Sequence, residues 1–493
     1  MIPKKATFAK NLRMSIKQNI FYNILLNISN VAFPIITVPY VSRVLLVENI
    51  GIVNFVTNYA SYFVMFAMLG IPTYGMREIA KRNDDFKACS KIFSELFSIS
   101  VFSTLIAVVV YVATIFMFDT LRAEWEYLLI AGAAVLFVPF GIDWFFTGRE
   151  NLKFTTIRSL VVKVISVVGL FIFVRTKEDL IPYLIFNLIA TIAGQMWTFI
   201  YLIRYEVRIS FKDLSLKPHL KPTIILFLST IAISIYTVLD TVMLGFLSDY
   251  SQVGYYSSAI KISRMVLPIV TAMSPVIMSR MNVCRGSGRM DDIPPLLSRS
   301  FDFMMILAVP VALGLVLIAP RFVPFFFGPD FVPATISMQL LSSLVLIIGI
   351  NNLFGVQALL GMGADKKFTI AVSVGTVTNF TLNWFVIPRW GSVGASYSSV
   401  VAEILVTVCV ILFSLKVVRI KISWKSLFQV LISSALLIPI SMLCDCLFSD
   451  NWSYLLGTLA GAGVLYGVMM MVVFRNPVAL SVIQPVLNKF IKR

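Results

Sequence analysis

Charged side chains inside long apolar segments are the residues of this sequence whose chemistry most needs an explanation. Asp240, Lys261 and Arg264 lie in two apolar segments that flank a short polar loop at 248–253. Asp240 lies about eight residues before this loop and Lys261 about eight after it, so both lie roughly 12 Å from the same end of their helices. This placement predicts a pair between Asp240 and Lys261. Arg264 adds a second cation on the same helical face as Lys261.

Asp143 and Lys163 are matched in the same way near the ends of two earlier segments, and Arg43 is a further charge inside an apolar segment. A charge at the centre of a membrane-spanning helix costs about 2.5–3.5 kcal/mol on insertion scales, so such residues usually face a cavity or a partner. Two interpretations stay open. Each pair is a salt bridge that locks two helices, or the charges line a cationic cavity that awaits an anionic substrate.

Carboxamide side chains also recur at helical spacing, which places them on one face of a helix. Three such stripes are Asn23, Asn27 and Asn30; Asn54 and Asn58 with Ser61; and Asn187 and Thr191 with Gly194 and Gln195. In a wet cavity these amides would bond to sugar hydroxyls. In a dry interface they would bond helix to helix, as small polar groups do in membranes.

Helices in a membrane are the elements that must position these residues. Of the 493 residues, 58% are hydrophobic and only 13% are charged, with a mean hydropathy of +0.90. A soluble protein carries roughly 25% charged residues, so much of this surface must face lipid. The sequence predicts an all-α polytopic membrane protein with about fourteen spans. These lie near 20–45, 50–74, 92–118, 127–147, 157–174, 181–203, 222–247, 254–280, 298–319, 332–359, 369–388, 393–415, 427–447 and 454–474.

The net charge of +17 is distributed as short basic clusters between the apolar runs, which is typical of cytoplasmic membrane loops and not of nucleic-acid binding. With both termini placed in the cytoplasm, few basic residues fall in the opposite set of loops: Arg122, Arg175, Lys177, Arg321 and Arg389. The one histidine, His219, lies in a polar segment, and the five cysteines lack metal or disulfide spacing. With outer loops of about a dozen residues at most, the chain is not expected to be an enzyme.

An internal repeat indicates how the spans are grouped. The segment Gly148–Ile157 (GRENLKFTTI) parallels Gly363–Ile370 (GADKKFTI), unless such short motifs recur by chance. The repeat predicts two pseudo-symmetric six-helix lobes with a substrate site between them, as in many transporters. The expected boundaries are an N-terminal lobe at 1–203, a cytoplasmic linker loop at 204–221, a second lobe at 222–415, and two further helices at 416–493. The tail at 478–493 is amphipathic and is expected to lie on the inner membrane surface.

Several motifs occur in a fixed order along nearly the whole chain. They are GIPTYGMREIAK at 70–81, GIDWFFTG at 141–148, LDTVMLG at 239–245, VGYYSSA at 253–259, FGPDF at 327–331, NFTLN at 379–383, GSVGA at 391–395, and Glu403. Together they resemble the polysaccharide-type flippases of the superfamily that also holds the multidrug and toxin extrusion (MATE) transporters.

This resemblance implies a V-shaped, two-lobed flippase in the bacterial inner membrane. It would move undecaprenyl-diphosphate-linked repeat units from the cytoplasmic to the periplasmic leaflet by alternating access, for O-antigen, capsule or exopolysaccharide assembly. No cofactor is implied beyond a coupling ion, H+ or Na+. The implied partners are the lipid-linked oligosaccharide, membrane lipid, a polysaccharide polymerase and a chain-length regulator. A MATE-type multidrug/cation antiporter is the alternative, and it would need unpaired carboxylates in its cavity.

The candidate substrate-binding residues follow from the charges and the amide stripes. A diphosphate favours Lys or Arg, and sugars favour amides and aromatic rings. The candidates are Asn27, Asn30, Arg43, Asn54, Asn58, Asp143, Lys163, Asp240, Lys261 and Arg264.

Overall fold

The computed structural model describes residues 16–82, 85–205, 207–212 and 214–480, and every regular element in these ranges is helical. Contacts divide the chain into two compact units, residues 1–238 and 239–493. The boundary falls inside helix α10 (Lys217–Leu247). The predicted all-α membrane fold class is confirmed. The predicted amphipathic tail lies almost wholly outside the described residues.

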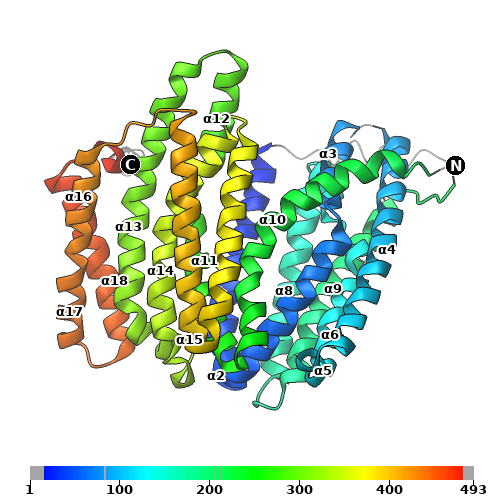
Figure 1. Ribbon diagram of the computed structural model, residues 1–493, viewed down its shortest axis with the longest axis horizontal. Coiled ribbons are helices and arrows are strands. Elements are labelled where there is room, and N and C mark those ends of the chain that lie inside the picture. The colour runs from blue at the N-terminus through cyan, green and yellow to red at the C-terminus, as the bar shows by residue number, and fades with distance from the viewer. Residues whose placement is uncertain (1–15, 83–84, 206, 213, 481–493) are drawn as a thin grey trace. The chain divides into compact units, whose positions relative to one another are not determined.

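The first unit is built around the long helix α2 (Ile16–Met68), which α4, α6 and α8 contact (Figure 1). The other helices of this unit are α3 (Ile71–Lys81), α4 (Phe86–Met117), α5 (Asp119–Ala123), α6 (Trp125–Leu136), η1 (Val138–Phe140), α7 (Asp143–Gly148), α8 (Leu152–Phe173) and α9 (Leu180–Tyr205). A straight helix of 53 residues would be ~80 Å long, against a hydrocarbon core of about 30 Å. The chain turns back at Leu46 (φ 63°, ψ 174°), between the predicted spans 20–45 and 50–74.

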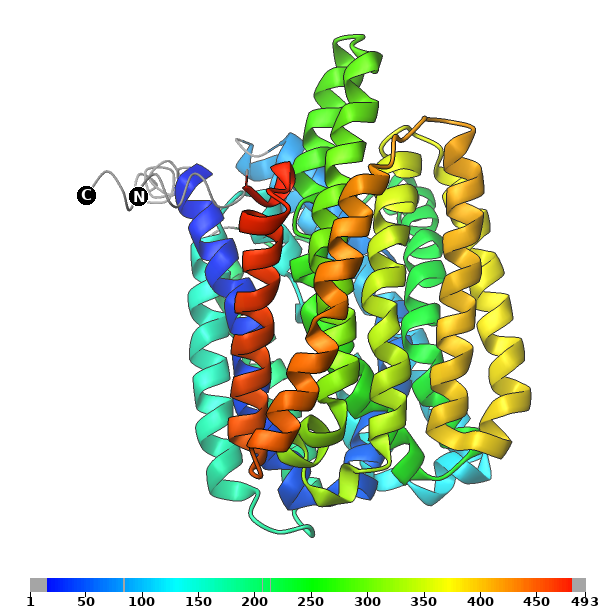
Figure 2. The same cartoon turned by 90° about the vertical axis from the view of Figure 1, so that its left-hand side faces the viewer.

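The second unit contains a comparable reversal in α15 (Asp365–Leu415). Figure 2 shows its two halves, in yellow and gold, running side by side in opposite directions. The turn is at Gly391 (φ 50°, ψ −127°), where a Cβ atom would overlap the side chain of Gln252. The same Gln252 Oε1 accepts the Ser392 N–H at 2.9 Å. Glycine is therefore needed here for both the backbone angle and the close approach.

The second unit contains a further group of helices, in which α13 and α14 pack against each other. They are α11 (Tyr250–Val270), α12 (Ser274–Gly286), η2 (Met290–Asp292), α13 (Ile293–Phe326), η3 (Pro329–Phe331), α14 (Ala334–Asn351), η4 (Asn352–Leu360), α16 (Trp424–Ala435), α17 (Leu437–Leu447), α18 (Asn451–Val468) and η5 (Met469–Val473). Helices α16, α17 and α18 pack on α13. Arg321 of α13 holds α17 and α18 by an ion pair with Asp445 (2.6 Å), a hydrogen bond to the Phe448 carbonyl (3.0 Å) and a contact with the Tyr454 ring.

The segment between α9 and α10 is bound along α4 rather than hanging free. Three of its N–H groups donate to α4 side chains: Arg208 to Ser90 Oγ (3.2 Å), Ser210 to Ser94 Oγ (3.1 Å) and Ser215 to Glu95 Oε1 (2.9 Å). His219, in the first turn of α10, is buried; its Nε2 lies 2.9 Å from Glu95 Oε2 and its Nδ1 lies 2.9 Å from the Tyr74 hydroxyl. The single histidine of the sequence thus belongs to a buried polar contact, not to an open polar loop.

Within the described residues, ten helices are long and apolar enough to cross a membrane, or eleven if the bent pair α11–α12 forms one span. Helices α2 and α15 enter this count once each despite their reversals, and α10 does not enter it. Counting the bent pair α11–α12 as one span, each reversed helix as two spans, and α10 as a further span would account for the predicted fourteen. That number stays a prediction.

Candidate functional site

A pocket of about 240 Å³ opens in the first unit between helices α2, α8 and α9. Its wall combines amide, hydroxyl, ammonium and aromatic groups with a few aliphatic side chains. It is lined by Asn30, Phe33, Pro34 and Thr37 of α2, by Lys163, Ser166, Val167 and Leu170 of α8, and by Tyr183, Phe186 and Asn187 of α9. The spacing of three to four residues on each helix places these side chains on one face.

Lys163 supplies the positive charge of this pocket. Its Nζ donates to Ser29 Oγ at 2.9 Å and to Asn30 Oδ1 at 2.5 Å, and it lies 5.7 Å from the centre of the Phe33 ring. In the part of the chain that the structure describes, no carboxylate lies within ion-pairing distance of Lys163. An ammonium group has three donors, so one remains available to a ligand.

Close packing of α8 against α9 shapes the pocket. A Cβ atom on Gly169 would overlap the Phe186 ring, so the glycine allows the two helices to approach at this level. Phe186 also stacks on Phe173, with ring centres 4.9 Å apart. These contacts hold Phe186 at the pocket wall.

The predicted pair of Asp143 and Lys163 is wrong, because Asp143 bonds to Arg158 instead. The two Arg158 terminal nitrogens each lie 3.0 Å from a carboxylate oxygen of Asp143, which is a bidentate pair. Arg158 is buried and also donates to the Gly194 carbonyl and to Thr198 Oγ1. Lys163 lies five residues further along α8, which turns it about 140° away from the face that carries Arg158.

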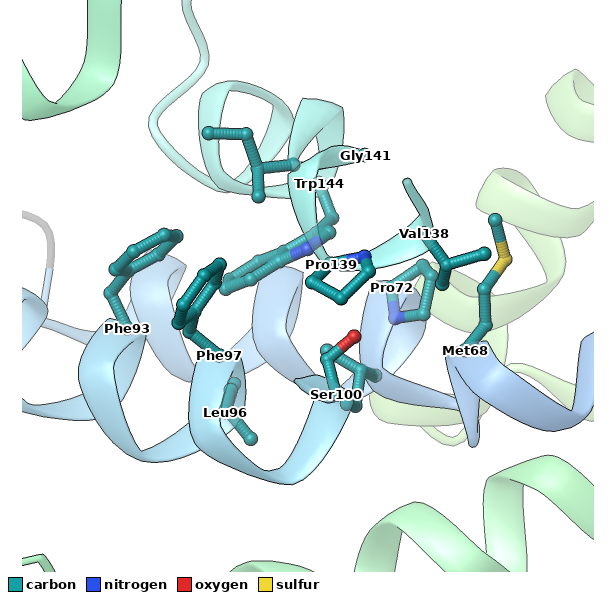
Figure 3. A pocket seen from close by; sticks show the side chains of 12 residues that line it. Met68, Pro72, Phe93, Leu96, Phe97, Ser100, Val138, Pro139, Gly141 and Trp144 are labelled. Carbon is teal, nitrogen blue, oxygen red and sulfur yellow. The ribbon is translucent and has the colours of Figure 1, made fainter. Parts of the chain in front are cut away.

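A smaller hollow lies where α3, α4 and α7 meet (Figure 3). Phe93, Phe97 and Trp144 crowd it, and its volume of about 10 Å³ is about that needed for one water molecule. This hollow is a packing defect and too small for a substrate.

Asp240 is the centre of a buried polar cluster in the second unit. Its side chain is 5% exposed and accepts four hydrogen bonds. The donors are Tyr256 Oη (2.5 Å), Ser399 Oγ (2.7 Å), Asn379 Nδ2 (2.9 Å) and Asn383 Nδ2 (2.6 Å). Asn383 Oδ1 is buried and has no hydrogen-bond partner. The cluster joins the end of α10 to α11 and to both halves of α15.

The predicted pair of Asp240 and Lys261 is not formed among the described residues. Tyr256 is the residue of α11 that reaches Asp240, and Lys261 lies five residues later, about 140° around the helix. Lys261 is half-buried, and within the ranges that the structure covers it has no hydrogen bond or ion pair. Arg264, on the neighbouring turn, is exposed. The second unit therefore also carries a partly buried cation.

The other predicted residues do not join the pocket of the first unit. Asn27 and Arg43 are exposed on α2, and Asn58 is half-buried there. Asn54 donates to the Ile50 carbonyl of its own helix at 2.7 Å. The side chain of Asn23 lies outside what the structure describes. Of the predicted set, Asn30 and Lys163 contact each other and line the same pocket.

Several site residues were absent from the sequence-based set, namely Arg158, Tyr183, Tyr256, Asn379, Asn383 and Ser399. Asn379 and Asn383 were quoted only as part of a motif. Their spacing of four residues places both carboxamides on one helix face, which could have indicated a shared partner. Arg158 falls at the edge of the predicted span 157–174, whereas α8 begins at Leu152 and places Arg158 well inside the helix.

Comparison with known proteins places this geometry in context. Residues 16–281 match the family described as polysaccharide biosynthesis protein. The chain is 27% identical over 415 residues to the putative O-antigen transporter of Escherichia coli (strain K12), covering 81% of this chain and 97% of that protein. It is 22% identical over 413 residues to the putative O-antigen transporter of Shigella dysenteriae, covering 82% and 100%.

Two solved structures share the fold. The lipid II flippase MurJ in an inward closed conformation superposes with a TM-score of 0.76 at 16% identity, covering 92% of this chain and 100% of that one. An inward-facing multidrug resistance MATE family transporter of the MOP superfamily superposes with a TM-score of 0.62 at 14% identity, covering 84% and 98%. At these identities the likeness shows the fold alone.

Proposed function

We propose, from the premise that this chain belongs to the polysaccharide biosynthesis protein family, that it carries undecaprenyl-diphosphate-linked oligosaccharide repeat units across the membrane by alternating access. The chain is a multi-pass membrane protein and a polysaccharide flippase of the MOP superfamily. The specific cargo and the direction, from the cytoplasmic to the periplasmic leaflet of the inner membrane, are our proposal.

The observation that carries the proposal is the unbalanced charge of Lys163 in a polar pocket within the apolar helices. A lysine in such a place is costly unless a partner neutralises it. Its protein contacts, Ser29 and Asn30, are both uncharged. An anionic substrate supplies the missing charge, and the amide and aromatic groups around Lys163 suit a sugar. Lys261 supports the same inference in the second unit.

The alternative, a multidrug/cation antiporter of the same fold, needs a carboxylate that is available to a cationic drug. Asp240 is a buried carboxylate, but four donors already surround it. Asp143 is held by both terminal nitrogens of Arg158. Asp240 is buried and Asp143 is already paired with Arg158, so neither acid is open to a drug-sized organic cation and the anionic cargo is favoured.

We further propose that the Asp240 cluster binds the coupling ion, either H+ or Na+. A hard cation such as Na+ prefers oxygen ligands. Asp240, the hydroxyl of Ser399 and the carboxamides of Asn379 and Asn383 can supply these, because rotation of each amide exchanges its nitrogen for its oxygen. The unpartnered Asn383 Oδ1 supports this rotation. Binding the ion would neutralise Asp240 and so change how firmly this carboxylate holds α10, α11 and α15 together.

The orientation follows the basic residues of the loops. We propose that both termini lie in the cytoplasm, and that a polysaccharide polymerase and a chain-length regulator act on the translocated units at the outer face. A protease-cleavable tag on either terminus tests this directly. Cleavage from the periplasmic side would contradict the proposed orientation.

The central experiment is flipping of a polyprenyl-diphosphate oligosaccharide in proteoliposomes, read out by a membrane-impermeant glycosidase. We expect the wild type to flip the glycolipid, and we expect the flipping rate to fall about tenfold or more in Lys163→Gln and Lys261→Gln. Each substitution removes a charge-assisted hydrogen bond to the substrate. Lys153→Gln is the matched control, because Lys153 lies exposed on the same helix as Lys163. Wild-type rates in both Lys163→Gln and Lys261→Gln, or transport of cationic drugs without glycolipid flipping, would refute the proposal.

A further inference from the structure

The pocket between α2, α8 and α9 has the size of a single ring. Its volume of about 240 Å³ is larger than the ~150 Å³ cavity that holds benzene, and smaller than the ~300 Å³ at which sites for drug-sized ligands begin. A whole repeat unit of several sugars would extend beyond the pocket. One six-membered ring with its substituents fits.

Two hydroxyl groups of the pocket can accept hydrogen bonds from a ligand. The hydroxyls of Thr37 and Ser166 donate to carbonyls of their own helices, those of Phe33 and Val162, at 3.1 and 2.7 Å. Their remaining capacity is to accept. A ligand with several hydroxyl donors complements such a wall, and a sugar ring has these donors.

The aromatic groups of the pocket suit the apolar faces of a ring. Phe33, Tyr183 and Phe186 line the pocket from two different helices. Phe186 is held by its stack on Phe173 and by its packing against Gly169. The wall therefore offers rigid apolar surfaces together with hydrogen-bond acceptors.

Lys163 adds a requirement for charge. It is the only Lys, Arg, Asp or Glu side chain among the lining residues, and its two protein partners are neutral. A neutral sugar would leave its third donor unmatched and its charge unbalanced. A carboxylate or phosphate on the ring would satisfy both.

We infer that this pocket binds one negatively charged sugar ring of the transported glycan, with Lys163 on the anionic group and Asn30 and Asn187 beside it. This inference rests on the proposed flippase function and names the sugar class that the first unit selects. The anionic group is either a carboxylate, as in a uronic acid, or a phosphate. The experiment separates these two sources.

The test uses the full-length protein in lipid nanodiscs and saturation-transfer NMR with four probes: methyl glucuronide, glucose 1-phosphate, methyl glucoside and inorganic phosphate. We expect binding of at least one charged sugar to be about tenfold or more tighter than that of methyl glucoside. The stronger of the two charged probes identifies the anionic group. Because this comparison uses only the wild type, it does not depend on any variant folding.

Variants then locate the site. Lys163→Gln should abolish the preference for the charged sugar, Lys163→Arg should retain most of it, and Lys153→Gln, at an exposed position of the same helix, should leave it unchanged. Equal binding of methyl glucoside and the charged sugars would overturn the inference, as would binding of inorganic phosphate as tight as that of glucose 1-phosphate.

Failure of this inference differs from failure of the proposed function. If lipid-linked glycans with only neutral sugars are flipped as fast as acidic ones, the pocket does not select charge but the flippase proposal stands. If neither class of glycolipid is flipped, the proposed function fails.

Discussion

Replacement of Asp240 by alanine should destabilise the second unit far more than replacement by asparagine. In the wild type one carboxylate accepts hydrogen bonds from Tyr256, Ser399, Asn379 and Asn383 in a buried environment. Alanine removes every acceptor at once. Asparagine keeps the shape and one oxygen, and the hydroxyls of Tyr256 and Ser399 can rotate to accept from its amide nitrogen.

The size of the alanine effect follows from which donors can find new partners. Tyr256 Oη and Ser399 Oγ already lie 3.0 Å apart, and Asn383 Nδ2 lies 3.2 Å from Asn379 Oδ1, so each pair can satisfy one donor internally. About two donors stay unsatisfied, each at about 1–3 kcal/mol, which gives a loss of about 2–6 kcal/mol for Asp240→Ala. For Asp240→Asn we expect about 1 kcal/mol, together with loss of ion-coupled transport.

Equilibrium unfolding in mixed detergent micelles, followed by circular dichroism, measures both variants on the full chain. Asp291→Ala is the matched control, because Asp291 is exposed and should change stability by less than about 0.5 kcal/mol. If Asp240→Ala unfolds at the same detergent fraction as the wild type, the buried network does not hold the helices and the reasoning is wrong. Retained ion coupling in Asp240→Asn would remove this residue from the coupling site.

Three further outcomes are expected. Arg158→Lys should lower stability by about 1–3 kcal/mol in the same unfolding assay, since lysine cannot make the bidentate contact with Asp143, and an unchanged midpoint would contradict this. Arg321→Ala should increase amide hydrogen exchange in α17 and α18 while leaving exchange in α2 unchanged, because it removes the ion pair and hydrogen bonds that tie α17 to α13. An equal change of the exchange rates in α2, α17 and α18 would contradict this prediction. Asp179 accepts hydrogen bonds from the N–H groups of Arg175 and Thr176, and these bonds lower the pKa of its carboxyl group. The stabilisation of the loop by Asp179 is therefore present above the ordinary aspartate pKa of about 4, and it is lost as the pH falls through the lowered pKa. Asp179→Asn should therefore speed exchange of these two amides at pH 7, and unchanged exchange rates would rule this out.

The sequence was sufficient to predict the helical membrane fold because hydrophobicity and length decide it. The reversal at Leu46 falls between two predicted spans for the same reason, since no helix of that length fits a bilayer. The importance of Lys163 was also predictable, because a charge among apolar residues needs a reason wherever it points.

The distance of each charged residue from the end of its helix was not sufficient to predict which charges pair. Two residues at matched depth meet only if their helices are also rotated toward each other, and one sequence does not fix that rotation. Lys163 and Lys261 each lie about 140° from the residue that makes the actual contact, Arg158 and Tyr256 respectively. In both cases the position along the helix was estimated usefully, but the direction of the side chain around the helix axis decided which residue made the contact.

The anchored segment before α10 constrains where bending can occur as the protein works. Arg208, Ser210, Ser215 and His219 are hydrogen-bonded to α4 or to Tyr74, so these residues belong to the first unit. The boundary between the two units comes later, at Val238. The chain therefore passes from one unit to the other within the continuous helix α10 and not within the segment before it, so the alternating access proposed above would have to bend or rotate this helix.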